Sequence, residues 1–136
     1  MTNKSELEIR VYYEDTDTLG MVYHANYLKF FERGRSEHVR SKGYNQSDLF
    51  SELGLLFSVR KMNIDFIKPA QFEQVLIIET EITVAKGARL VFNQQARCKN
   101  SSEIYCKAEV KIACVDKETG KPTRLPEKFI TEIVNA

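Results

Sequence analysis

Apolar residues recur at every second position through four stretches in the second half of the chain. These stretches are 56–66, 76–84, 90–98 and 104–114. The spacing predicts four long β-strands, because successive side chains of a strand point to opposite faces of the sheet. Polar residues such as Glu79, Lys107 and Lys111 fill the alternate positions. One wetter face favours an antiparallel sheet.

The first half of the chain has a different period. Residues 7–13 alternate enough to form a first strand. From 25 to 42 the period becomes helical, with a stripe made of Tyr27, Phe30, Phe31, Gly34 and His38. The links 86–88 and 99–102 are hairpin-sized, too short for a parallel crossover. The pattern therefore predicts an α+β fold in which one long helix packs against a curved antiparallel sheet of about five strands.

Composition narrows the functional class. The chain has 136 residues, 43% of them apolar, and a net charge of +1, which fits a single domain over residues 1–136 and gives no indication of nucleic-acid binding. No signal peptide or membrane-spanning run is present in the sequence, so a cytoplasmic protein is expected. Cys98, Cys106 and Cys114 lack a C-x-x-C pair, which favours reduced, buried thiols over a disulfide framework or a zinc site.

The stretch with candidate chemistry is YYEDTDTLGMVYHANY, residues 12–27, between the first strand and the helix. Helix N-termini present unpaired N–H groups that favour an oxyanion. A calcium loop fits poorly, because Leu19 and Asn26 stand where oxygen ligands belong, and no common zinc pattern matches. We therefore expect no metal. On these residues alone, carboxylate catalysis and ordinary turn and capping chemistry both remain open.

The run V-Y-Y-E-D-T-D-x-x-G-x-V-Y-H-A-N-Y-L, residues 11–28, resembles the active-site signature of the 4-hydroxybenzoyl-CoA thioesterase family of hotdog-fold enzymes. The similarity continues through F-x-E-R-x-R-x-E at 30–37, V-R-K-M at 59–62, P-A at 69–70, E-T-E-I at 79–82, K-G-A at 86–88, V-D at 115–116, K-P at 121–122 and L-P at 125–126. Within that family it is most similar to the YbgC-type acyl-CoA thioesterases associated with the Tol-Pal envelope system. The pair Thr18-Leu19 replaces the small residues often found at these positions in relatives. The loop path and the acyl pocket are therefore expected to differ from those of relatives.

This resemblance implies a hotdog fold, a homodimer or homotetramer joined sheet edge to sheet edge, and hydrolysis of an acyl-CoA thioester. It makes Asp17 the nucleophile or general base, and it makes the His24 N–H the group that polarises the thioester carbonyl. The side chains of His24 and Tyr13 would orient water or Asp17. Tyr23 and Asn26 are further candidate substrate contacts, although Asn26 would also tie the loop to the helix, and Asp15 would serve the turn.

Coenzyme A, as part of the substrate, carries phosphates that call for cations, and no separate cofactor is expected. The candidates are Arg60, Lys61, Lys86 and Arg89, of which Arg60 falls on the apolar side of its predicted strand. Acyl carrier protein is an alternative donor, and a peripheral link to the cell envelope is a further expectation. Two other functions stay open: a hotdog enoyl-thioester hydratase, whose D-x-N-P-x-x-H motif the sequence lacks, and an acyl-binding partner with little turnover. The sequence leaves the acyl chain length open.

Overall fold

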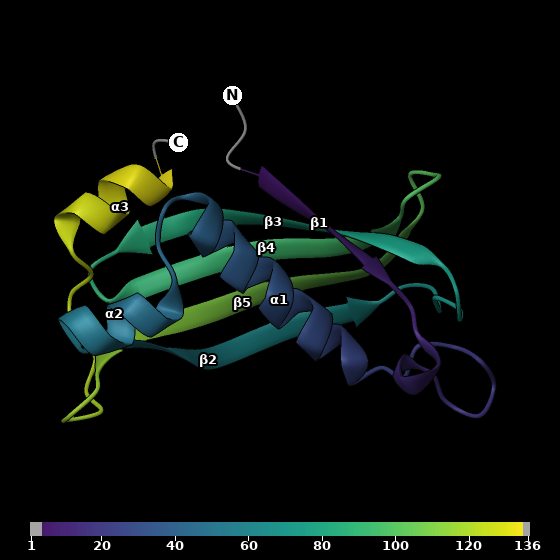
Figure 1. Ribbon diagram of the computed structural model, residues 1–136, viewed down its shortest axis with the longest axis horizontal. Coiled ribbons are helices and arrows are strands. Elements are labelled where there is room, and N and C mark those ends of the chain that lie inside the picture. Colours follow the sequence, from purple (N-terminus) through teal and green to yellow (C-terminus); the bar gives the residue numbers. More distant parts are fainter. Residues whose placement is uncertain (1–3, 135–136) are drawn as a thin grey trace.

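The fold is a five-stranded antiparallel sheet with one long helix across it (Figure 1). The computed structural model describes residues 4–134. The strands lie in the order β1-β3-β4-β5-β2, with every neighbouring pair antiparallel. Their bounds are β1 Lys4–Arg10, β2 Leu55–Phe66, β3 Val75–Lys86, β4 Arg89–Cys98 and β5 Ile104–Asp116; the helices are α1 Asn26–Ser41, α2 Gln46–Leu53 and α3 Glu127–Val134. The predicted fold class is confirmed.

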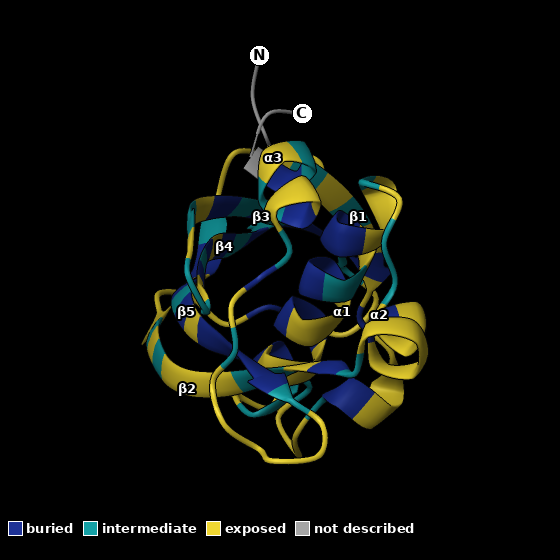
Figure 2. Cartoon of the chain, turned by 90° about the vertical axis from the view of Figure 1, so that its left-hand side faces the viewer, coloured by how far each residue is buried: buried dark blue, intermediate teal, exposed yellow. Residues whose placement is uncertain are grey.

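Helix α1 packs its predicted stripe against the inner face of the sheet. Tyr27, Phe30 and Phe31 are buried, and in Figure 2 the buried residues lie between the helix and the sheet. Burial of each large apolar side chain contributes about 1.5–3 kcal/mol. Gly34 allows the closest approach, because a Cβ there would lie 2.8 Å from the hydroxyl oxygen of Thr80. The aromatic stripe and its glycine therefore determine where α1 lies on the sheet.

A buried polar network crosses the same contact. The Gln94 amide on β4 donates to the Phe31 carbonyl oxygen at 2.8 Å and to the Thr80 hydroxyl at 2.9 Å. In turn, Arg35 Nη1 on α1 donates to Gln94 Oε1 at 3.0 Å. Every polar atom of the Gln94 amide head group thus has a partner, so the network links α1 to β3 and β4 at a defined register.

The predicted position of Arg60 on the apolar face of its strand is wrong, whereas its role as a phosphate-binding cation stays a prediction. A β-bulge between Val59 and Lys61 interrupts the pairing of β2 with β5. Because a bulge adds one residue to a strand, it reverses the alternation beyond it. Val59 and Met62 therefore face the same groove beside α1, while Arg60 is exposed and lines a hollow on the opposite face of the sheet.

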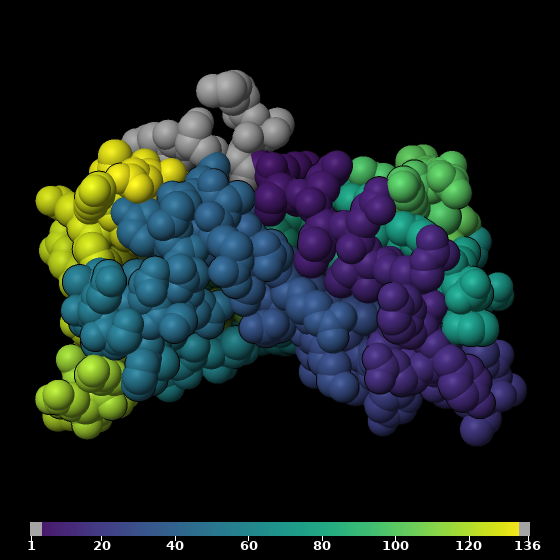
Figure 3. Space-filling view, in the orientation of Figure 1, coloured from purple at the N-terminus to yellow at the C-terminus, as the bar shows by residue number. Residues whose placement is uncertain are grey.

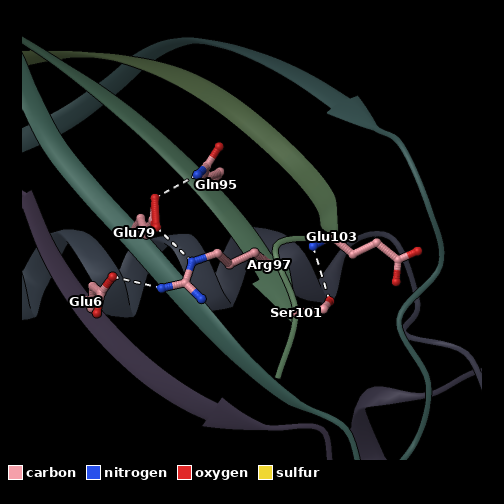
Figure 4. Close-up of polar contacts among 6 residues, drawn as sticks. All are labelled: Glu6, Glu79, Gln95, Arg97, Ser101 and Glu103. Atoms are coloured by element: carbon pink, nitrogen blue, oxygen red, sulfur yellow. Dashed lines mark hydrogen bonds and ion pairs between the residues drawn. The ribbon is translucent and has the colours of Figure 1, made fainter. Parts of the chain in front are cut away.

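The outer face of the sheet carries a ladder of polar contacts across three strands (Figure 4). Arg97 on β4 donates from Nε to Glu79 at 2.8 Å and from Nη2 to Glu6 at 2.9 Å. Gln95 donates to the other oxygen of Glu79 at 2.6 Å. In the adjoining turn, the Glu103 N–H donates to the Ser101 hydroxyl. The ladder ties the edge strand β1 to the sheet.

Two short helices were not predicted. In α2, the Asn45 side chain caps the first turn by accepting the Asp48 N–H at 2.8 Å, and Gly54 ends the helix at a φ of 68°. Helix α3 buries Phe129 and Ile133 at the far end of the core. None of the helices between residues 4 and 134 is both long and apolar enough to cross a bilayer. The cysteines are free, two buried and Cys98 half-buried.

Candidate active site

The segment between β1 and α1 is held by a buried carboxylate. After a 3₁₀ turn at Tyr13–Asp15, the Asp15 side chain accepts the Tyr12 N–H at 2.8 Å and the Asn26 amide at 2.9 Å. The Asp15 carbonyl oxygen accepts the Tyr23 N–H. Asp15 and Asn26 therefore join the two ends of the segment, which is the turn role that the sequence suggested for Asp15.

A second clamp comes from the connection between β2 and β3. The Val22 N–H donates to the Ala70 carbonyl oxygen at 2.8 Å, and the Ala70 N–H donates to the Tyr27 hydroxyl at 3.3 Å. Burial raises the pKa of Tyr27 to about 12, so its hydroxyl stays protonated at neutral pH. This clamp positions the segment relative to the start of α1.

Asp17 lies at the exposed turn of the segment. One of its oxygens, Oδ1, accepts the Leu19 N–H at 2.8 Å and the Met21 N–H at 3.3 Å. Gly20 closes the turn with a φ of 78°, a conformation that costs glycine little. Within residues 4–134 the second oxygen, Oδ2, has no hydrogen-bond partner. The turn therefore orients the carboxylate and leaves one oxygen available.

The start of α1 presents backbone donors. The Asn26 N–H donates to Tyr23 and the Tyr27 N–H to His24, but among the described residues the N–H groups of His24 and Ala25 have no acceptor. The helix dipole adds partial positive charge at this end. Such donors suit an oxygen that gains negative charge during a reaction.

Aromatic side chains surround these groups. The His24 ring lies 4.6 Å from the Tyr23 ring and 5.8 Å from the Phe66 ring at the end of β2. Tyr13 is 79% exposed and packs against Phe72, at the opposite border of the segment. The roles assigned to His24, Tyr13 and Tyr23 stay predictions. The aromatic neighbours on β2 and after it were not identified from sequence.

The predicted phosphate-binding cations lie elsewhere in the chain. Arg60, Lys61 and Arg89 line one hollow of about 430 Å³ on the outer face of the sheet, with Lys111 as a fourth cation that sequence reasoning did not assign there. Lys86 pairs with Arg89 across the β3–β4 hairpin. Strand β3 starts at Val75, five residues after the clamp at Ala70, and runs twelve residues to this hairpin, roughly 35–40 Å at the rise of a strand. Within the chain these cations therefore lie far from Asp17.

Three comparisons with known proteins agree on the kind of protein that this chain resembles. Residues 11–133 match the model of the thioesterase-like superfamily. The chain is 41% identical to the acyl-CoA thioesterase YbgC of Haemophilus influenzae over 94% of this chain and 93% of that protein. A probable thioesterase from Bartonella henselae has a crystal structure with a TM-score of 0.85 and 44% identity, covering 90% and 99% of the two chains. A 4-hydroxybenzoyl-CoA thioesterase structure matches in fold with a TM-score of 0.90 at 16% identity, covering 97% and 99%.

Proposed function

The chain belongs to the thioesterase-like superfamily, and we propose that it hydrolyses an acyl-CoA thioester at the loop that holds Asp17. The observation that carries this proposal is a carboxylate with one available oxygen in the loop that leads to α1, where the N–H groups of His24 and Ala25 lack acceptors within residues 4–134. A base or nucleophile and an oxyanion site are the two elements that acyl transfer to water requires.

In the general-base route, the Asp17 carboxylate takes a proton from water as the water oxygen adds to the thioester carbonyl carbon. The N–H of His24 stabilises the carbonyl oxygen as it gains negative charge. The carbon–sulfur bond then breaks, and the proton on Asp17 passes to the departing thiolate. The products are a free acid and coenzyme A.

In the nucleophilic route, Asp17 itself adds to the carbonyl carbon and expels the thiolate, and water then cleaves the resulting anhydride. A single turnover in H₂¹⁸O tests for the nucleophilic route, because label in Asp17 arises only through the anhydride. When water attacks the aspartyl carbon of the anhydride, the nucleophilic route leaves ¹⁸O in Asp17, whereas the base route leaves it only in the product acid. Mass spectrometry of the peptide that contains Asp17 measures the difference.

The site is proposed to be completed by a second protomer. Strand β2 is an edge of the sheet, twelve residues long, and Leu56, Val59 and Phe66 on it are more than 40% exposed. Such an edge favours pairing with another strand. Antiparallel pairing of β2 with its copy brings the Phe66 end of one protomer, beside His24, to the Leu55 end of the other.

That pairing brings the cations toward Asp17. Arg89 pairs with Ala113 and Ala113 pairs with Ser58, so the cationic hollow lies toward the Leu55 end of β2. The hollow of one protomer would then receive the coenzyme A phosphates of a substrate whose thioester lies at the partner's Asp17. Co-expression of Asp17→Asn and Arg89→Ala chains tests this arrangement. A shared site regains activity in the mixed dimer, whereas a site within one protomer stays impaired.

Thiol release from a panel of acyl-CoAs tests the activity, with short, long and aromatic acyl groups and one acyl group carried on acyl carrier protein. Hydrolysis of any member by the wild type supports the proposal, and the best substrate defines its class. Binding without thiol release would indicate an acyl-binding partner. Addition of water to an enoyl-CoA, with the thioester intact, would indicate a hydratase.

A further inference from the structure

A groove runs between α1 and β2 along the first turns of the helix. It has a volume of about 560 Å³, and its apolar lining consists of Leu28, Val59 and Met62. In Figure 3 the lower outline of the molecule is indented between β2 and the start of α1. The bulge in β2 builds this lining, because it turns Val59 and Met62 to the same side. The groove therefore has an apolar wall on both the helix and the strand.

The groove lies on the same helix and strand as the candidate active site: its lining starts at Leu28, four residues after His24, and at Met62, four residues before Phe66. The Phe66 ring, on the strand that forms one wall, contacts both the His24 ring and the Tyr27 ring. Arg35 follows His24 by eleven residues, all but the first two steps along α1, so the two positions are about 16 Å apart at the rise of an α-helix. A chain whose thioester lies at the His24 N–H can therefore follow the groove toward Arg35.

Arg35 is a buried cation at the inner end of this path. It is only 7% exposed, and its one described hydrogen bond goes to a neutral acceptor, Oε1 of Gln94. Within the described chain no carboxylate lies within 4 Å of its guanidinium, although it lines both this groove and a smaller hollow beyond Val59. Burial lowers the pKa of Arg35, and the charge of Glu32 partly offsets this effect.

The Arg35 nitrogens without a described partner stay accessible, since none is among the buried unpartnered atoms of the described residues, so a guanidinium with four further N–H donors can receive an anion from the groove. The rim of the groove is also cationic, with Lys29 and Arg33 against the single carboxylate of Glu32. Both features favour an anionic group over a plain hydrocarbon end. A planar carboxylate suits the guanidinium fork, which can bind it through two parallel hydrogen bonds.

We propose that this groove holds the acyl chain and that Arg35 binds a carboxylate at its far end, so that the preferred substrates are ω-carboxyacyl thioesters. The inference rests on the proposed function for the position of the thioester. Arg35 acts as a specificity-determining residue and takes no part in cleavage of the thioester bond. Arg35 distinguishes substrates by the end of the acyl group that is remote from Asp17.

The test compares ω-carboxyacyl-CoAs with methyl-terminated acyl-CoAs of equal chain length, from succinyl to sebacoyl. The wild type is expected to prefer the carboxylate-terminated member of at least one pair by about tenfold or more in kcat/KM, since hydrogen bonds to charged groups are among the stronger ones. Arg35→Met is expected to abolish this preference, and Arg35→Lys to keep part of it. Arg40→Met, an exposed arginine on α1 paired with Glu37, is the matched control and keeps the preference.

The same pairs are bound to Asp17→Asn protein to obtain dissociation constants without turnover. A preference in binding that disappears with Arg35→Met supports the inference even if no thiol is released, in which case only the proposed function fails. Three results overturn it. The inference fails if the wild type shows no preference for the carboxylate-terminated member of any pair. An equal loss of affinity for both members of a pair in Arg35→Met also overturns it, because that result indicates that Arg35 binds coenzyme A phosphate. A dimer that dissociates in Arg35→Met with the preference unchanged indicates a carboxylate of the partner subunit.

Discussion

His38 is expected to make the protein less stable as the pH falls below 6.5. Its ring lies in the core, 1% exposed, with Nδ1 2.7 Å from the Ser5 hydroxyl and an edge-on contact with Phe92, and within residues 4–134 its Nε2 has no partner. Burial, with a smaller effect of Lys42, lowers the pKa of His38 to about 4. The unfolded chain, with a histidine pKa near 6.5, therefore binds the proton first as the pH falls.

The size of the effect follows from the two pKa values. Between pH 7 and pH 5 His38 becomes protonated in the unfolded state but stays largely neutral in the folded state. This difference removes about 2 kcal/mol of the free energy of unfolding. Urea unfolding at both pH values measures the loss in wild type, in His38→Leu and in His24→Gln. His24 is the only other histidine, and it is exposed. The pH-dependent loss should shrink by about that amount in His38→Leu and persist in His24→Gln; equal losses in wild type and His38→Leu would refute the reasoning.

Three further substitutions test the packing and the loop. Gly34→Ala should destabilise the fold by about 1–3 kcal/mol in thermal unfolding, because its Cβ would lie 2.8 Å from the Thr80 hydroxyl oxygen; an unchanged Tm would contradict this contact. Asp15→Ala leaves two donors unpaired and should lower both the stability, by about 2–3 kcal/mol, and the rate of thiol release; full activity would show that the loop needs no such anchor. Although burial opposes it, hydrogen bonds from Arg97 and Gln95 lower the pKa of Glu79. Glu79→Gln should therefore cost about 1 kcal/mol at pH 7 and nothing once acid protonates the wild-type carboxyl, and a loss that persists in acid would contradict the ion pair.

The fold was largely predictable because the helical period and the two-residue strand period both depend on the spacing of apolar residues within one element. The aromatic stripe of α1 and the alternation of β3, β4 and β5 each need only the residues of one element. The bulge in β2 could not be predicted, because a bulge depends on pairing with β5. Alternation alone therefore placed Arg60 on the wrong face. Helices α2 and α3 are eight residues each, too short for a strong periodic pattern.

The candidate site was predictable only in its local part. The stretch around Asp17 is contiguous, so its loop and helix start could be recognised together. The Ala70 clamp, the aromatic Phe66 and the groove that ends at Arg35 join residues far apart in the sequence. The buried contact of Arg35 with Gln94 spans 59 positions. No local pattern indicates such a contact, because a buried and an exposed arginine on a helix look alike in sequence.

The most direct test of the account is the rate of thiol release by wild type and by Asp17→Asn on the best acyl-CoA, at equal concentrations of folded protein. Asp65→Asn, an exposed aspartate near the end of β2, serves as the matched control. Because an amide can neither accept the proton from water nor attack the carbonyl, Asp17→Asn should fall by roughly 10²–10⁴-fold while Asp65→Asn stays near wild type. A rate for Asp17→Asn close to that of wild type would contradict the central role given to this carboxylate.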